Sequence, residues 1–91
     1  MEIDLGKELT VMEVGPMRER LLEALGEAEA IRVDGSAIEQ VDGAALQLLA
    51  SFVKTAGERS IEVNWAGVSQ VLADASRILG LEQVIPVAEA E

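Results

Sequence analysis

The chain alternates between short segments with apolar residues at every second position and longer segments with a helical spacing, which predicts an α/β fold. Glu2–Leu5 alternates polar and apolar residues, and a Gly-Lys turn after it predicts a β-hairpin with Leu9–Met12. Pro16 then predicts the end of the second strand and the first turn of a helix, because its fixed φ suits that position.

The helix that begins near Pro16 has apolar residues three to four positions apart, and its charged residues fall mostly on other faces. Its predicted core face consists of Met17, Leu21, Ala24, Leu25 and Ala28. The next apolar segment, Ala30–Asp34, predicts a strand. A strand, a helix and a strand in this order predict a right-handed crossover with parallel pairing.

The second half of the chain repeats this alternation. Residues 43–57 predict a helix that ends at a glycine, and residues 58–65 predict a strand with Ile61, Val63 and Trp65 on one face. Ser69 is the predicted N-cap of a third helix. The predicted apolar stripe of that helix is Val71, Leu72, Ala75, Ile78 and Leu79.

These segments predict one α/β domain with the order ββαβαβα and a mixed sheet of about four to five strands, with the helices mainly on one face. A length of 91 residues fits a single small domain. We expect residues 1–87 to form that domain and residues 88–91 to be a frayed tail. Its core must be aliphatic, since Phe52 and Trp65 are the only aromatic residues.

The charge of the chain excludes two classes of partner. Lys and Arg total 7 against 17 Asp and Glu, which gives a formal net charge of −10. Such a charge repels nucleic-acid phosphates and anionic lipid headgroups, so we expect no nucleic-acid partner and no direct membrane insertion. The N-terminus does not resemble a signal peptide, and no window holds the roughly 20 apolar residues that span a bilayer. We therefore expect a cytoplasmic protein.

The side-chain chemistry argues against an enzyme. The chain has no cysteine and no histidine, which removes thiolate nucleophiles, the commonest general base and the commonest metal ligand. Asp34 and Asp42 could lie near each other, but no substrate pocket or separation of their pKa values is visible in the sequence. We expect no catalytic residue, no metal site and no cofactor.

The segment around Asp42 is the strongest candidate for a site, because a predicted strand and loop end there and a helix begins. A helix start offers free N–H groups and the positive end of a dipole, so it can bind an anion. Asp42 is the predicted N-cap, with its carboxylate accepting from the N–H of Ala44 or Ala45, and capping alone would explain it. Ser36 with Glu39 resembles a capping box for one helical turn.

The order of elements and three short motifs resemble the STAS domain, named for sulfate transporters and anti-sigma factor antagonists. The motifs are VDGS at residues 33–36, VDGAALQLL at residues 41–49 and LGLEQVIPV at residues 79–87. The resemblance covers Glu2 to about Val87. It implies a compact mixed sheet with helices largely to one side.

The resemblance also implies where a phosphate would be carried. In phospho-regulated members, a serine directly after the aspartate is phosphorylated by a partner kinase, which adds about −1.5 to −2 charge. Gly43 occupies that position here, and Ala44 follows it, so neither can carry a phosphate. Ser36, six residues before Asp42, is the alternative regulatory hydroxyl, although a capping role would also explain it.

The start of the helix after Asp42 is the expected partner-binding surface. The resemblance points to this helix start and its adjoining loops as the docking region. The predicted patch consists of Asp42, Gly43, Ala44, Gln47 and Leu48. Leu48 has an alternative role, which is to fill a flank against a neighbouring helix.

The resemblance implies a protein-interaction module similar to anti-sigma factor antagonists, and it implies no catalytic activity. Its expected partner is a kinase, an anti-sigma factor or a chemotaxis-type signalling complex. The alternative is an accessory subunit of an ABC transporter of the lipid-asymmetry type, whose partner would be the transporter ATPase. A homodimer is compatible with either function.

Overall fold

A computed structural model describes residues 1–85, in which five strands and three helices follow one another. In chain order they are β1 (Glu2–Asp4), β2 (Glu8–Leu9), α1 (Val11–Glu27), β3 (Ala30–Gly35), β4 (Gln40–Val41), α2 (Gly43–Glu58), β5 (Glu62–Val68) and α3 (Gln70–Ile78). The α/β class and the order ββαβαβα are confirmed, with the two-residue strand β4 added before α2. The predicted tail, residues 88–91, lies outside the described residues.

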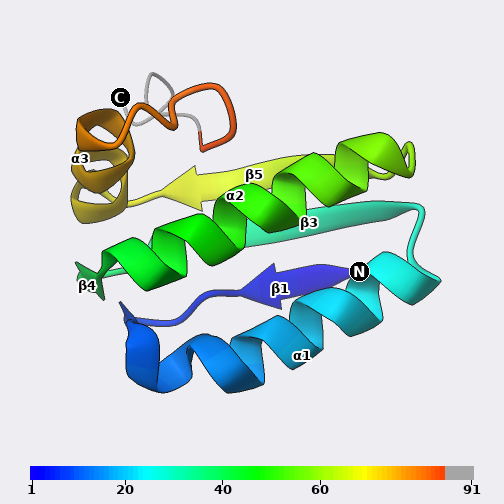
Figure 1. Cartoon of the computed structure of the whole chain (residues 1–91), viewed down its shortest axis with the longest axis horizontal. Coiled ribbons are helices and arrows are strands. Elements are labelled where there is room, and N and C mark those ends of the chain that lie inside the picture. The colour runs from blue at the N-terminus through cyan, green and yellow to red at the C-terminus, as the bar shows by residue number, and fades with distance from the viewer. Residues whose placement is uncertain (86–91) are drawn as a thin grey trace.

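The strands form two parallel sheets. The larger has the order β1-β3-β5, and the smaller pairs β2 with β4 (Figure 1). The carboxyl ends of the strands in the larger sheet lie on the side of the molecule where α1, α2 and α3 begin. Loops on this side are where α/β proteins commonly place their sites.

The predicted hairpin, and with it the mixed sheet, is wrong. β1 pairs only with β3, and Leu5 N–H continues that ladder to the Asp34 carbonyl at 2.9 Å. Gly6 then turns the chain with a φ of +78°, and its N–H donates to Asp4 Oδ1 at 2.8 Å. This turn carries the chain away from β1, so that Glu8–Leu9 pairs in parallel with Gln40–Val41 instead.

The first helix also begins earlier than predicted, at Val11, because Thr10 and Glu13 form a capping box. The N–H of Met12 donates to Thr10 Oγ1 at 3.3 Å, and the N–H of Thr10 donates to Glu13 Oε1 at 2.8 Å. Pro16 lies inside the helix and does not begin it. This segment therefore contributes to a helix start and not to a second hairpin strand.

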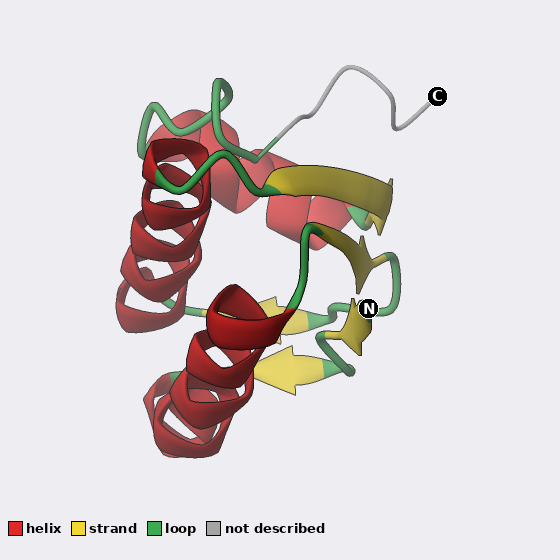
Figure 2. Ribbon diagram, turned by 90° about the vertical axis from the view of Figure 1, so that its right-hand side faces the viewer, coloured by secondary structure: helices red, strands yellow, loops and turns green. Residues whose placement is uncertain are grey.

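Helices α1 and α2 cover one face of the larger sheet, as Figure 2 shows. The predicted core face of α1 is confirmed at Met17, Leu21, Ala24 and Leu25, which are buried, whereas Ala28 is partly buried after the helix ends. Helix α2 buries Ala45, Leu46, Leu49 and Phe52. The outer face of the sheet is polar. Glu2 and Arg32 lie opposite each other in register there, with 3.9 Å between their charged groups.

The predicted stripe of α3 is wrong, although its N-cap is confirmed, since Ser69 Oγ accepts from the N–H of Leu72 at 3.1 Å. The buried residues of α3 are Leu72, Ala73 and Ser76, whereas Ile78 is 81% exposed. Ser76 donates to the Ile85 carbonyl at 3.1 Å, so its side chain is satisfied inside the protein. The small residues Ala73 and Ser76 let this face of the helix pack closely, which a count of large apolar residues does not reveal.

The last strand of the larger sheet begins four residues later than predicted, at Glu62 in place of Glu58. The N–H of Arg59 bonds the Ala56 carbonyl at 3.1 Å, which extends α2 past Gly57 to Glu58. Ser60 has a φ of 59° and reverses the chain before the strand begins. The helix end is therefore set by Ser60 and not by Gly57.

Candidate functional site

The candidate site is built around Asp42, whose carboxylate caps two helices. Asp42 Oδ1 accepts from the N–H of Ala45 at 3.0 Å, which confirms its predicted role as the N-cap of α2. Asp42 Oδ2 accepts from the N–H of Val11, the first residue of α1, at 2.8 Å. This second bond joins residues 31 positions apart and was not predicted.

One further feature holds the starts of α1 and α2 together. The parallel pairs of β2 and β4, Glu8 with Gln40 and Leu9 with Val41, directly precede the two caps. Next to them, the N–H and hydroxyl of Thr10 both donate to Glu13 at 2.8 Å. The backbone bond from Thr10 holds the pKa of Glu13 below its usual value, with the Asp42 carboxylate acting in the opposite direction. The Asp42 carboxylate supplies the negative charge that the start of α2 favours.

Gly43 is the first residue of α2, and it is exposed. No heavy atom lies within 4 Å of the place a Cβ would occupy, and the φ of Gly43 is not in the left-handed region. Neither space nor backbone conformation therefore requires glycine at this position. The position that resembles the phosphoacceptor serine is open to solvent and to a larger side chain.

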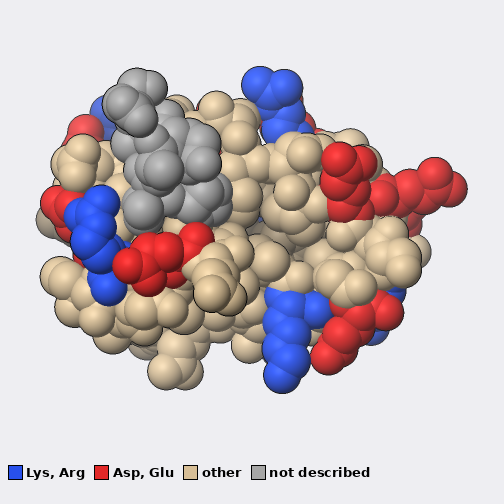
Figure 3. All heavy atoms as spheres, turned by 90° about the horizontal axis from the view of Figure 1, so that it is seen from above, with Lys and Arg blue, Asp and Glu red and all other residues tan. Residues whose placement is uncertain are grey.

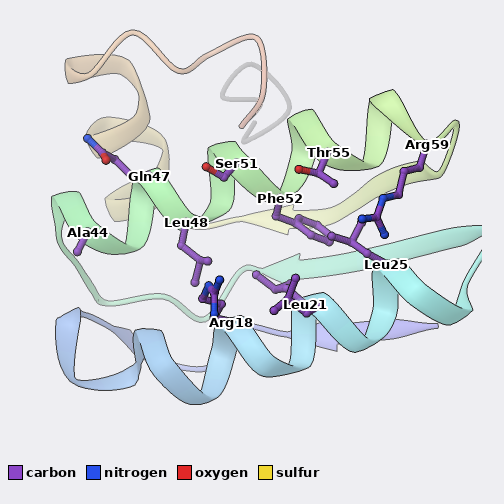
Figure 4. A pocket seen from close by; sticks show the side chains of 11 residues that line it. Arg18, Leu21, Leu25, Ala44, Gln47, Leu48, Ser51, Phe52, Thr55 and Arg59 are labelled. Atoms are coloured by element: carbon purple, nitrogen blue, oxygen red, sulfur yellow. The ribbon is translucent and has the colours of Figure 1, made fainter.

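An open groove of about 480 Å³ lies between α1 and α2 (Figure 4). Three of the predicted patch residues, Ala44, Gln47 and Leu48, line it, whereas Asp42 and Gly43 lie at the α2 start outside its lining. The other lining residues are Arg18, Leu21, Leu22, Leu25, Ser51, Phe52, Thr55 and Arg59. Leu48 is partly buried against the core, as a flank residue would be, and it also lines the groove.

Sequence reasoning missed the arginines of this groove. Arg18 is among the charged residues that are predicted to lie off the core face of the first helix, and Arg59 falls in the strand predicted at residues 58–65. A signal was present, because Ala44, Gln47, Ser51, Thr55 and Arg59 follow one another at spacings of three to four residues, which is one face of a helix. The patch predicted at the α2 start continues along the whole helix.

Ser36 lies in a turn after β3 and does not cap a helix, so its predicted capping box is wrong. Its hydroxyl and its N–H both donate to Asp34 Oδ1, at 2.6 Å and 2.9 Å. The Ser36 hydroxyl, then its N–H and then Arg32 hold the pKa of Asp34 below its usual value. Glu39, the other half of the predicted box, has its N–H bonded to the Lys7 carbonyl at 2.6 Å.

The charges of the chain are spread over its surface. On the face that Figure 3 shows, acidic side chains stand mainly toward the two ends, and uncharged surface with some Lys and Arg side chains lies between them. Within residues 1–85, no three Asp or Glu side chains gather in a way that could hold a metal ion. None of the helices in this part of the chain is long and apolar enough to cross a membrane.

The chain matches a model of a known protein family. The family model described as "Mlab, STAS domain" matches residues 1–86. No curated protein matches the chain. The match spans nearly all of the chain, and the order of strands and helices agrees with the predicted order, although the strands pair in parallel. The chain therefore belongs to the STAS domain family, whose members are in general interaction modules related to anti-sigma factor antagonists.

Proposed function

We propose that this chain is a non-enzymatic protein-interaction module that docks a signalling partner at the start of α2, without phosphorylation at position 43. The partner is a kinase, an anti-sigma factor or a chemotaxis-type complex. The observation that carries the proposal is the exposure of Gly43 and Ala44 at the first turn of α2. Small exposed residues there let the backbone of another protein approach closely.

The residue types support the absence of a phosphate switch at position 43. Gly43 and Ala44 have no hydroxyl group, and Asp42 already supplies the negative charge that a helix start favours. A docking surface of this kind presents the same charge at all times. Its control would depend on the concentration or state of the partner and not on modification at this position.

The arrangement of the carboxylates supports a role without catalysis. Both oxygens of Asp42 accept backbone N–H groups, and Oδ1 of Asp34 accepts two hydrogen bonds from Ser36. The bonds from Ser36 hold the pKa of Asp34 below its usual value, which does not suit a general acid. Asp34 and Asp42 are better explained as structural caps.

A second candidate function is an accessory subunit of an ABC transporter of the lipid-asymmetry type. The description of the matching family model, "Mlab, STAS domain", favours it. The docking surface would be the same, and the partner would be the nucleotide-binding ATPase of the transporter. The two candidates therefore differ in the partner and not in the surface.

Affinity purification tests both candidates. The tagged chain should retain a kinase or receptor-coupling protein in the first case, and an ATPase with its permease in the second. Ala44→Glu and Leu48→Asp should each abolish that capture, because they place a charge on the docking surface. Lys54→Glu is the control, since Lys54 is exposed on α2 outside the groove. Capture that survives both surface variants would refute the proposal.

A further inference from the structure

The groove between α1 and α2 has a charge opposite to that of the chain. The formal net charge is −10, yet the groove is lined by Arg18 and Arg59 and by no Asp or Glu. Neither arginine forms an ion pair with any residue in the described part of the chain, 1–85. Two guanidinium groups are thus available at the groove, which gives it charge complementarity to an acidic partner.

The groove is also long and partly apolar. Its α2 wall extends from Ala44 to Arg59, a span of about 22 Å at the rise of an α-helix. Leu21, Leu25 and Phe52 are buried and form its floor, and Leu22 is 47% exposed at its side. An elongated occupant with one apolar stripe would cover Leu22 and the partly buried Leu48 above this floor.

The polar residues of the groove distinguish between elongated occupants. Gln47, Ser51 and Thr55 follow one another along the α2 wall, as Figure 4 shows. A hydrocarbon chain would leave their amide and hydroxyl groups without partners, at a cost in free energy. A helix can place apolar side chains on the floor and polar side chains opposite this wall.

We propose that the groove receives an acidic amphipathic α-helix of the partner protein. Its apolar stripe would cover Leu22 and Leu48, and carboxylates beside that stripe would pair with Arg18 and Arg59. The inference rests on the proposed function and names the chemistry of its partner. It extends the docking surface from the α2 start along the whole of α2.

Site-specific photo-cross-linking tests this inference in cells that encode the chain. The photoreactive residue benzoylphenylalanine replaces Thr55 in the groove or, as a control, Lys54 on the same helix outside it. Mass spectrometry then identifies the segment joined at each position. The Thr55 position should capture a segment with apolar residues at helical spacing and acidic residues beside them, and the Lys54 position should not.

Charge reversal then tests the two arginines. The double variant Arg18→Glu, Arg59→Glu should lower the cross-linking yield at Thr55 about tenfold, since it places like charges across the interface. Arg20→Glu with Lys54→Glu makes the same change of net charge at exposed positions outside the groove and should leave the yield within about twofold. Lysines in place of the acidic residues of the captured segment should restore binding to the double variant.

The possible results separate the two proposals. The inference about the groove would be overturned if Thr55 is joined to a basic segment, to a lipid or to a second copy of this chain. It would also be overturned if the arginine variants do not change the cross-linking yield. If Ala44→Glu and Leu48→Asp still abolish affinity capture in that case, the proposed docking function stands. If neither method captures a protein, both proposals are overturned.

Discussion

The Asp42 carboxylate accepts the backbone N–H of Val11 at 2.8 Å, so a residue that begins α2 also holds the first residue of α1. The same carboxylate caps α2 through Ala45 at 3.0 Å. One side chain therefore sets the relative position of two helix starts. The distance between these starts in turn fixes one end of the groove that both helices line.

Asp42→Ala should destabilise the fold more than the loss of a single cap. We expect about 1–3 kcal/mol, at the upper end of the values for one N-cap, because N–H groups of two helices lose their acceptor. Asp42→Asn should cost less, since its one carbonyl oxygen can still cap one of the two helices. Urea denaturation gives both values.

Ser69→Ala is the matched control for Asp42→Ala, because Ser69 caps only α3. Its expected cost is about 1 kcal/mol. If Asp42→Ala costs no more than Ser69→Ala, then the bond to Val11 contributes nothing and Asp42 is an ordinary cap.

Gly43→Ser should fold as well as the unmodified chain and should create a phosphoacceptor. A side chain at this position meets no atom within 4 Å, so we expect the free energy of unfolding to change by about 0.5 kcal/mol or less. A phosphate-sensitive gel with the partner kinase should show a shifted band for Gly43→Ser only. A shifted band for the unmodified chain would place the phosphate on another hydroxyl, and Ser36→Ala would then test the exposed turn after β3.

The core faces of α1 and α2 could be predicted because their large apolar residues recur at helical spacing, as Met17, Leu21 and Leu25 do. The pairing of β2 could not, since two residues carry too little pattern to select a partner 32 positions away in the chain. Thr10 and Glu13 match the pattern of a capping box and so indicate the start of α1, but the prediction placed that start near Pro16. Proline is the stronger signal for a helix start, and here the weaker signal of the capping box was the correct one.

The candidate site was predictable only in part for a similar reason. Asp42, Gly43 and Ala44 are adjacent in sequence, so a motif could mark them. The packing of α1 against α2 places Arg18 and Arg59 along one groove, and no local pattern links them. The charge of the groove is therefore a property of the fold and not of a motif.

Glu13→Gln should reduce the loss of stability in acid. The pKa of Glu13 is lowered in the folded protein by its bonds from Thr10, so its charged form stabilises the fold. That contribution is complete above the ordinary pKa of 4.5 and is lost as the pH falls through the lowered folded value. Glutamine keeps an acceptor for Thr10 and does not titrate. The difference in urea midpoint between about pH 6 and about pH 3 should therefore be smaller in Glu13→Gln.

Asp34→Asn is the comparison for this measurement. Bonds from Ser36 also lower the pKa of Asp34 from its ordinary value of 3.8. Asp34→Asn should therefore reduce the loss of stability as the pH falls below that value. An unchanged acid dependence in Glu13→Gln would mean that the capping box does not hold the charged form.

Two substitutions in α3 should have opposite outcomes if the observed packing is correct. Leu72 is fully buried and Ile78 is 81% exposed. Leu72→Ala should cost about 2–5 kcal/mol, because it leaves a cavity in the core. Ile78→Ala should cost about 0.5 kcal/mol or less. Comparable losses for the two variants would favour the stripe that the sequence predicted, in which both residues face the sheet.

Ser76 holds the segment after α3 against the protein through its bond to the Ile85 carbonyl at 3.1 Å. Ser76→Ala should cost about 1–3 kcal/mol, since it leaves the buried carbonyl without its donor. Ser76→Val should cost more, because the added methyl groups enter a space that is already filled. Ser51→Ala is the control, since Ser51 is exposed on α2. Hydrogen exchange should show faster opening near Ile85 in Ser76→Ala and an unchanged rate in Ser51→Ala. Unchanged exchange in Ser76→Ala would mean that Ile85 is held by its apolar contacts alone.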